Sequence, residues 1–433
     1  MGFPKFILVR QKFEAPSLQD IPRAVESQID ALRLEGKIIP GQTVAVACGS
    51  RGIAHYSQII GATVRALKKK KLEPFIIPAM GSHGAATAEG QKEVLAKSGV
   101  SESDIGAPVR SSLDVNLVGE TEDHIPVCMD KFAFQADHVV LINRVKGHTD
   151  FGSDIGSGLL KMMAVGLGKP TGAATCHRAI LRHGFPRTIQ LMARKVMETG
   201  KILFGLAIVE NAYAETAEVT ALLTDVLEQE EKALLKKARR LAARLPFDEI
   251  DVLVIDEMGK KISGTGFDTN VVGRIHQPLL TDEPEHPAVK RIVVCNLSDD
   301  SYGNALGVGL ADFITRRLAD KINVEALYAN CIAALQPERG KIPLTLINDR
   351  EAIEVAIRSV GMISPEKLKV MRIRNTLRLG EVAVSEGYAD EISKRKDLTI
   401  VSGARSLRFD ALGNLQPFDQ KTDPTMRADN ASP

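Results

Sequence analysis

Lys161 is an isolated amine in an apolar stretch of the chain. Its neighbours are Leu159, Leu160, Met162 and Met163, within "NRVKGHTDFGSDIGSGLLKMMAVGLGKPTGAATCH" (residues 143–177). Lysine is costly to bury and is rarely placed in an apolar run unless it is paired, reaches water or is covalently modified. A desolvated amine is also a route to a covalent cofactor bond. Two interpretations therefore stay open: an exposed position on an amphipathic helix, or an attachment site.

Three histidines accompany this lysine. His148 has polar neighbours in "KGHTDFGSD", and His83 stands in the glycine-rich loop "GSHGAAT", so we expect both rings to be open to a ligand. Imidazole is a suitable acid or base near neutral pH. His177 closes the stretch, and a lone imidazole there is a candidate ligand for nickel, copper or zinc.

The segment "GLGKPTG" (residues 166–172) resembles a phosphate loop but departs from the known patterns. A Walker loop needs Ser or Thr directly after its lysine, and here Pro170 follows Lys169. The glycine spacing is GxGxxxG, not the GxGxxG of dinucleotide-binding folds. An NAD(P)-dependent oxidoreductase that uses this loop is therefore the rival interpretation.

The candidate residues follow predicted strands. Short apolar runs at 43–49, 73–80 and 136–145 are typical of buried parallel strands, and the loops after them hold Arg51, His83 and His148. Parallel strands bring such loops to one edge of the sheet, where open α/β sheets bind ligands. We therefore expect an α/β fold with parallel-rich sheets and one ligand crevice.

At 433 residues the chain is long for one core, so two α/β domains are expected, with the active-site cleft between them. We place an N-terminal, cofactor-anchoring domain at 1–245 and a C-terminal domain at 246–404, with residues about 405–433 free to return to the first. Helices are predicted near 217–244, 304–321 and 349–360, and strands near 201–210, 251–256 and 291–295. The polar tail from about 420 is expected to be disordered.

Composition narrows the class of protein. The net charge is +2, so no bulk field recruits nucleic acid or an anionic membrane. The five cysteines are scattered singly, which argues against an iron–sulfur or zinc-ribbon site and fits a reducing cytoplasm. The N-terminus lacks the pattern of a signal peptide, and no apolar stretch approaches the roughly 20 residues of a membrane span. We expect a cytoplasmic protein, with the oligomeric state open and a homo-oligomer among the alternatives.

Together these motifs resemble the lactate racemase family that depends on a nickel-pincer cofactor. The matching features are "GSRG", "GSHGAAT", and a histidine, a glycine-rich segment ending in lysine and a second histidine, over roughly residues 40–210. The resemblance implies that Lys161 carries the nickel-pincer nucleotide (pyridinium-3-thioamide-5-thiocarboxylic acid mononucleotide) covalently and that His177 ligates nickel. It further implies that His83 and His148 are alternating acid/bases and that Arg51 binds substrate. Lys260 or Lys261 would contact the cofactor or substrate.

The implied activity is a racemase or epimerase that inverts C2 of a 2-hydroxy acid. The cofactor would take hydrogen from C2 as hydride while a base removes the hydroxyl proton, and one histidine would serve each enantiomer. Arginine suits a carboxylate because its fork binds two oxygens. The implied partners are the small 2-hydroxy acid and the proteins that synthesise the cofactor and insert nickel.

The chain departs from the family in ways that bear on substrate. Cys48 stands three positions before Arg51, where the family usually has an acidic residue. With no Trp and 4% aromatic residues, a polar acid such as a sugar acid or dicarboxylate is favoured over lactate. A non-catalytic binding or maturation protein is a further alternative, although binding alone needs no pair of bases.

Overall fold

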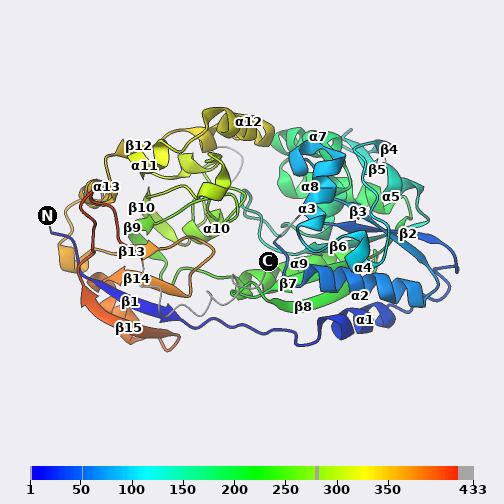
Figure 1. Ribbon diagram of the computed structural model, residues 1–433, viewed down its shortest axis with the longest axis horizontal. Coiled ribbons are helices and arrows are strands. Elements are labelled where there is room, and N and C mark those ends of the chain that lie inside the picture. Colours follow the sequence, from blue (N-terminus) through cyan, green and yellow to red (C-terminus); the bar gives the residue numbers. More distant parts are fainter. Residues whose placement is uncertain (1, 51, 278–281, 418–433) are drawn as a thin grey trace. The chain divides into compact units, whose positions relative to one another are not determined.

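The computed structural model describes residues 2–50, 52–277 and 282–417, which form two compact units (Figure 1). Unit 2 is the continuous segment Glu14–Ala242, and unit 1 combines Met1–Phe13 with Ala243–Pro433. The division differs from the one drawn at residue 245, because the first 13 residues belong to unit 1. The location of an active site between two domains stays a prediction.

Unit 2 is built on a five-stranded sheet with the order β3-β2-β6-β7-β8. Its strands are β2 (Thr43–Cys48), β3 (Glu73–Pro78), β6 (His138–Arg144), β7 (Ile202–Glu210) and β8 (Thr216–Leu222). The first four strands of the order are parallel, and β8 is antiparallel to β7. Three of them correspond to the predicted strands that carry candidate residues in the following loops.

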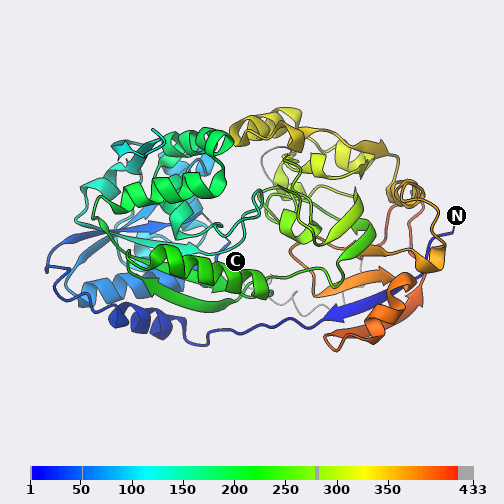
Figure 2. The same ribbon diagram turned by 180° about the vertical axis from the view of Figure 1, so that it is seen from behind.

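Helices cover both faces of this sheet (Figures 1 and 2). They are α1 (Ile21–Ala31), α2 (Tyr56–Lys69), α3 (Ala88–Ala96), α4 (Glu102–Ile105), α5 (Lys131–Gln135), α6 (Leu159–Lys161), α7 (Lys169–His183), α8 (Phe185–Met197) and α9 (Leu227–Leu241). Alternate β2 residues face opposite cores: Val44 and Val46 pack with α1 and α2, while Ala45 and Ala47 pack with α6 to α9. A separate hairpin joins β4 (Val115–Glu120) to β5 (Pro126–Asp130).

One helix of unit 2 is shorter than the sequence predicts. The prediction of a helix over 217–244 is wrong in its first third, where the chain forms β8. This segment pairs with β7 in an antiparallel ladder, and Val219 and Ala221 are buried on the sheet. Such pairing depends on a partner strand, so helical periodicity alone did not reveal it.

Unit 1 is built on an eight-stranded mixed sheet with the order β12-β11-β10-β9-β13-β14-β1-β15. The strands are β1 (Phe6–Gln11), β9 (Glu249–Ile255), β10 (Ala288–Val294), β11 (Phe313–Thr315), β12 (Leu344–Leu346), β13 (Val370–Ile373), β14 (Glu381–Ser385) and β15 (Leu398–Arg405). The order from β12 to β13 is parallel, and the rest is antiparallel. The α/β fold with parallel-rich sheets is thus confirmed.

The helices of unit 1 are short. They are α10 (Thr269–Val272), α11 (Arg316–Ala319), α12 (Val324–Ala334), α13 (Asp349–Arg358) and α14 (Ala389–Ser393). The prediction of one helix near 304–321 is wrong, because β11 and α11 divide that segment. Gly307 has φ +95° and lies against the Thr265 carbonyl, so the chain turns there and cannot continue a helix.

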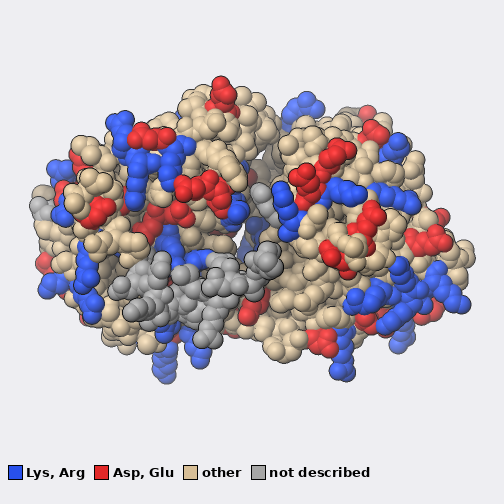
Figure 3. All heavy atoms as spheres, in the orientation of Figure 1, with Lys and Arg blue, Asp and Glu red and all other residues tan. Residues whose placement is uncertain are grey.

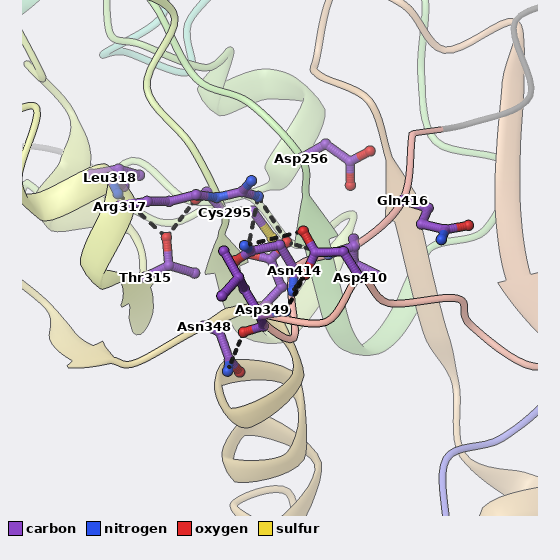
Figure 4. A network of polar contacts seen from close by, with 12 residues as sticks. Asp256, Cys295, Thr315, Arg317, Leu318, Asn348, Asp349, Asp410, Asn414 and Gln416 are labelled. Carbon is purple, nitrogen blue, oxygen red and sulfur yellow. Dashed lines mark hydrogen bonds and ion pairs between the residues drawn. The ribbon is translucent and has the colours of Figure 1, made fainter.

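A buried ionic network holds the last described residues of unit 1 (Figure 4). The Asp349 carboxylate accepts both hydrogen bonds from Nη2 of Arg317, at 2.7 and 3.0 Å, and one from the Leu415 backbone N–H at 2.7 Å. Arg372 pairs with Asp256 and donates to the Gln416 carbonyl. Residues up to 416 are thereby fixed to unit 1. The tail predicted to be disordered from about 420 lies outside the described residues.

Acidic and basic side chains are interspersed over the face of each unit shown in Figure 3. The dense basic run at the end of α2 is locally neutralised, since Lys69 pairs with Glu26 and Lys70 with Asp30. Within the described part of the chain, no helix combines the length and the apolar character needed to cross a membrane.

Candidate active site in unit 2

The site is defined by the point where the strand order of unit 2 reverses. From β2 the chain goes to β3 on one side and later to β6 on the other, so the loops after β2 and β6 diverge. Such a reversal opens a crevice at the carboxyl ends of the strands. The loops after β2, β3 and β6 are those that carry Arg51, His83 and His148.

Lys161 ends the short helix α6, which follows the loop after β6. The Asn143 amide donates to the Gly158 carbonyl at 2.9 Å, and Lys146 and Ser157 exchange two backbone hydrogen bonds that close the loop. A π-helical turn, η2 (Met162–Gly166), comes directly after Lys161. Such turns are frequently found at functional sites.

The environment of Lys161 decides between the two interpretations of its apolar neighbours. Leu159, Leu160, Met162 and Met163 are all buried in the core, whereas Lys161 itself is half-buried. The segment is therefore not an exposed amphipathic helix. Burial lowers the pKa of the Lys161 amine to about 8, although the charge of Asp150 opposes the shift.

The amine of Lys161 contacts His148. Nζ lies 2.5 Å from Nε2 of the ring, while Nδ1 accepts the Asp150 backbone N–H at 3.0 Å. A nitrogen that accepts carries no proton, so the single proton of the neutral ring is assigned to Nε2. In that tautomer Nε2–H donates to Nζ, which requires the uncharged amine. A pKa of about 8 leaves a fraction of the amine uncharged near neutral pH, and this uncharged form is the nucleophile.

His148 is less open than its polar neighbours in the sequence suggest. Its ring is buried and lies 4.6 Å from the ring of Phe185 and 5.2 Å from that of Phe151. Burial and then the nearby Lys161 charge lower the pKa of His148 well below its usual value. The ring is therefore uncharged at neutral pH.

His177 approaches the same group from α7. It is half-buried, and its charge contributes to the lowered pKa of His148, so the two imidazoles are electrostatically coupled. The preceding residue, Cys176, acts on Lys161 in the opposite direction, because its charge raises the pKa of the lysine amine. The structure thus brings His148, Lys161 and His177 into one neighbourhood.

His83 lies in a loop packed on the π-helical turn. Its exposed ring places Nδ1 2.5 Å from the Met80 carbonyl. Gly81 has φ +59°, and a Cβ there would lie 3.3 Å from the Val165 side chain, so this loop approaches η2 closely. The placement fits the expected open ring. Its role as a base stays a prediction.

Arg51 lies outside the described residues, but both sides of its loop are held in place. The Ala54 backbone N–H donates to Glu210 at 2.7 Å, and Glu210 also pairs with Arg144. Gly49 lies so near Asn143 that a Cβ would come within 2.8 Å of its side-chain oxygen. The substrate-binding role of Arg51 stays a prediction.

Lys260 and Lys261 belong to unit 1, in the loop after β9. Nζ of Lys260 donates to the Gly264 carbonyl at 2.9 Å, and that of Lys261 lies 3.1 Å from Asp300. A contact of either lysine with a cofactor or substrate stays a prediction.

Lys169 has a structural environment that argues against a phosphate loop. It is fully buried, and its amine donates to the Pro78 carbonyl at 2.8 Å and to Gln91 at 2.6 Å, with Asp130 at 3.4 Å. A phosphate-binding lysine must reach a ligand. This amine instead joins β3, α3 and β5.

Glu231 is a residue of this region that the sequence analysis missed. It stands on α9, and its buried carboxylate accepts the backbone N–H groups of Leu159 and Leu160 at 2.5 and 3.1 Å. A signal was present: Glu231 lies four residues after Leu227 and four before Leu235, on the apolar face of the helix. A carboxylate on that face requires a partner.

No group of three or more His, Cys, Asp or Glu side chains placed to hold a metal ion is found among residues 2–50, 52–277 and 282–417. The donors near Lys161 are instead the separate imidazoles of His148 and His177.

Comparison with known proteins identifies the class of this domain. Residues 8–186 match the family model of the lactate racemase N-terminal domain. The chain therefore carries a lactate racemase-like N-terminal domain, and the resemblance drawn from its motifs is confirmed. No curated protein matches the chain.

Two solved structures are similar to the chain. A Thermotoga maritima protein from a structural genomics consortium is 15% identical, with a TM-score of 0.50 over 84% of this chain and 98% of its own, and it shares the fold. The lactate racemase apoprotein from Thermoanaerobacterium thermosaccharolyticum is 12% identical, with a TM-score of 0.46 over 82% of this chain and 87% of its own.

Proposed function

We propose that the protein is a 2-hydroxy acid racemase or epimerase whose nickel-pincer nucleotide is attached to Lys161. The observation that carries the proposal is the Lys161 amine, with a pKa of about 8 and 2.5 Å from a neutral imidazole. A neutral amine is the form that attacks an activated thiocarboxyl carbon. The lactate racemase-like domain supports the same chemistry.

The donor set near Lys161 fits such a cofactor. Lys161 would hold it by a thioamide bond, and His177 would offer one neutral imidazole to nickel. When bound, the group supplies an acceptor for the C2 hydrogen as hydride. Acylation removes the basicity of the lysine nitrogen, so the Nε2–H of His148 loses its acceptor. With the ring proton moved to Nδ1, Nε2 would be free to accept the hydroxyl proton of the substrate.

The remaining steps belong to side chains of the protein. His148 would take or return the hydroxyl proton on one face of the substrate and His83 on the other, because the two enantiomers present that hydroxyl differently. Arg51 would hold the carboxylate with two parallel hydrogen bonds while C2 inverts. A polar substrate, such as a sugar acid or dicarboxylate, is favoured over lactate.

The proposal is tested by producing the protein together with cofactor-synthesis and nickel-insertion proteins. Intact mass and metal analysis should show one nickel-containing adduct, which Lys161→Ala abolishes and the control Lys97→Ala, at an exposed position, keeps. An adduct that survives in Lys161→Ala contradicts the attachment site. Purification with exchangeable NAD(P) and no adduct would favour the oxidoreductase.

Activity is measured on a panel of 2-hydroxy acids in ordinary and deuterated water. Hydride return keeps the original hydrogen at C2, so the racemised product should carry no deuterium there. Full incorporation would indicate proton abstraction instead. No isomerisation of any acid by nickel-loaded protein would favour a binding or maturation protein.

A further inference from the structure

Glu231 is a buried carboxylate for which the proposed chemistry has no direct use. Its side chain lies between α9 and the start of α6, and both of its described hydrogen bonds come from backbone N–H groups of that start. The first N–H groups of a helix have no partner within the helix, so a side chain must satisfy them when they are buried. Here the partner comes from a helix 72 residues away along the chain.

Glu231 holds the backbone immediately before Lys161, the residue that contacts His148. Leu160 directly precedes Lys161, and the Met162 N–H donates back to the Gly158 carbonyl at 3.0 Å. The carboxylate thus fixes the backbone on which the lysine side chain is built. The groups whose charges act on the lysine amine are Asp150, Cys176 and Lys146, and His148 contacts it directly.

Gly158 is matched to this carboxylate. A Cβ at Gly158 would lie 2.5, 2.6 and 2.9 Å from three atoms of the Glu231 carboxyl group, and these are its nearest neighbours. The φ of Gly158 is −169°, which any residue can adopt. The glycine is therefore required by the carboxylate, and not by the backbone conformation.

We propose that Glu231 is a positioning residue that holds α6 so that the Lys161 amine stays against His148 as a nucleophile. The inference rests on the proposed role of Lys161 as the attachment site. It adds a residue from α9, outside the segment 8–186 that matches the racemase domain.

The test is trace acetylation of the full-length, unloaded protein with acetic anhydride, read by mass spectrometry against exposed Lys97. The amine nitrogen forms the amide bond, the anhydride C–O bond breaks, and acetate and a proton leave. In the wild type, labelling of Lys161 should rise with a midpoint near pH 8. In Glu231→Ala the midpoint should move toward the 10.5 of a free lysine, which lowers labelling at pH 8 at least about tenfold.

Four variants separate positioning from loss of fold. Glu231→Gln keeps one acceptor oxygen, so it should restore most of the labelling. Glu230→Gln, at an exposed position of α9, is the matched control and should label as the wild type does. Gly158→Ala should reduce labelling like Glu231→Ala, and the double variant should be no worse than Glu231→Ala, because the added methyl then has room.

The inference is overturned if Glu231→Ala and Gly158→Ala keep the wild-type midpoint, or if their effects add in the double variant. Because no cofactor is present, the result is independent of the proposed function. If the labelling midpoint lies near pH 8 and depends on Glu231, the positioning role holds. If the same protein never acquires the nickel adduct, the proposed function alone is rejected.

Discussion

At the scale of single residues, two lysines eight positions apart show how surroundings set chemistry. Lys161 has an imidazole as its close partner and a pKa lowered to about 8. Lys169 is more deeply buried but is surrounded by oxygen acceptors, among them the Asp130 carboxylate. Burial lowers the pKa of both amines, but Lys169 also donates directly to oxygen acceptors, which stabilise its ammonium ion. Only Lys161 is therefore suited to form a covalent bond.

A prediction at this scale concerns His177. In a pincer site the cofactor fills three nickel positions and one remains for a neutral imidazole. His177→Ala should therefore keep the organic adduct on Lys161 but lose most of the nickel, measured by intact mass and metal analysis. His183→Ala changes another histidine of α7, one that pairs with Asp123, and should keep full nickel content. Unchanged nickel in His177→Ala would assign the ligand elsewhere.

A second prediction concerns the ionisation of Glu231. Burial raises its pKa from 4.5 to about 7, so the folded state binds this proton more tightly than the unfolded state does. Its contribution to stability is thus present below pH 4.5 and is lost as the pH rises through 7. Glu231→Gln cannot ionise. The difference in unfolding free energy between Glu231→Gln and the wild type should therefore change by about 3 kcal/mol in favour of the variant from pH 4 to pH 8, measured by urea unfolding.

Glu228→Gln is the control of opposite sign. Arg194 lowers the pKa of Glu228, so the stability contributed by that pair is present near neutral pH and is lost as the pH falls. A difference between wild type and Glu231→Gln that does not change with pH would contradict the assigned ionisation.

At the scale of elements, the site depends on contacts between segments that are distant in the sequence. The π-helical turn η2 lies between the loop of His83 and helix α8, and α9 caps α6 from the far side. Lys169 joins β3, α3 and β5 through one amine. These connections fix loops that would otherwise be free at the carboxyl ends of the strands.

The prediction at this scale is that Lys169 serves the fold. Lys169→Met leaves the Asp130 carboxylate buried without its cation, which should cost about 3–5 kcal/mol of unfolding free energy. The additional change Asp130→Asn should recover part of this loss. Lys195→Met removes a surface pair with Glu198 and should cost at most about 1 kcal/mol. Loss of nucleotide binding with unchanged stability would instead support the phosphate loop.

At the scale of the whole molecule, the two units differ in how the chain builds them. Unit 2 is continuous from Glu14 to Ala242, whereas unit 1 needs residues from both ends of the chain. Strand β1 pairs with β14 on one side and β15 on the other, and its Val9 is fully buried. Unit 1 therefore cannot complete its sheet without the first residues of the chain.

This arrangement predicts how fragments behave. Residues 14–242 should fold alone, with a cooperative thermal transition followed by circular dichroism. Residues 243–433 should not, because β14 and β15 lose the strand between them. Joining residues 1–13 to residue 243 through a flexible linker should restore folding. A stable fragment 243–433 would show that β1 is dispensable.

The sequence by itself determined the features that depend on neighbouring residues. Apolar runs located the parallel strands β2, β3 and β6, and the apolar neighbours of Lys161 indicated that this lysine is unusual. The fold class followed from the alternation of strands and helices, and the racemase-like domain from the order of Arg51, His83, His148, Lys161 and His177. All of these are patterns over short stretches of chain.

The tertiary structure decided what depends on distant partners. In the folded chain His148 is buried against Phe185, and Glu231 accepts hydrogen bonds from the first N–H groups of α6. Lys169 pairs with the buried Asp130 carboxylate. The tertiary structure also made residues 216–222 a strand and assigned β1 to unit 1. The free energy of burying a polar group depends on which partner it contacts. That partner can lie far away in the sequence, so a local pattern does not reveal it.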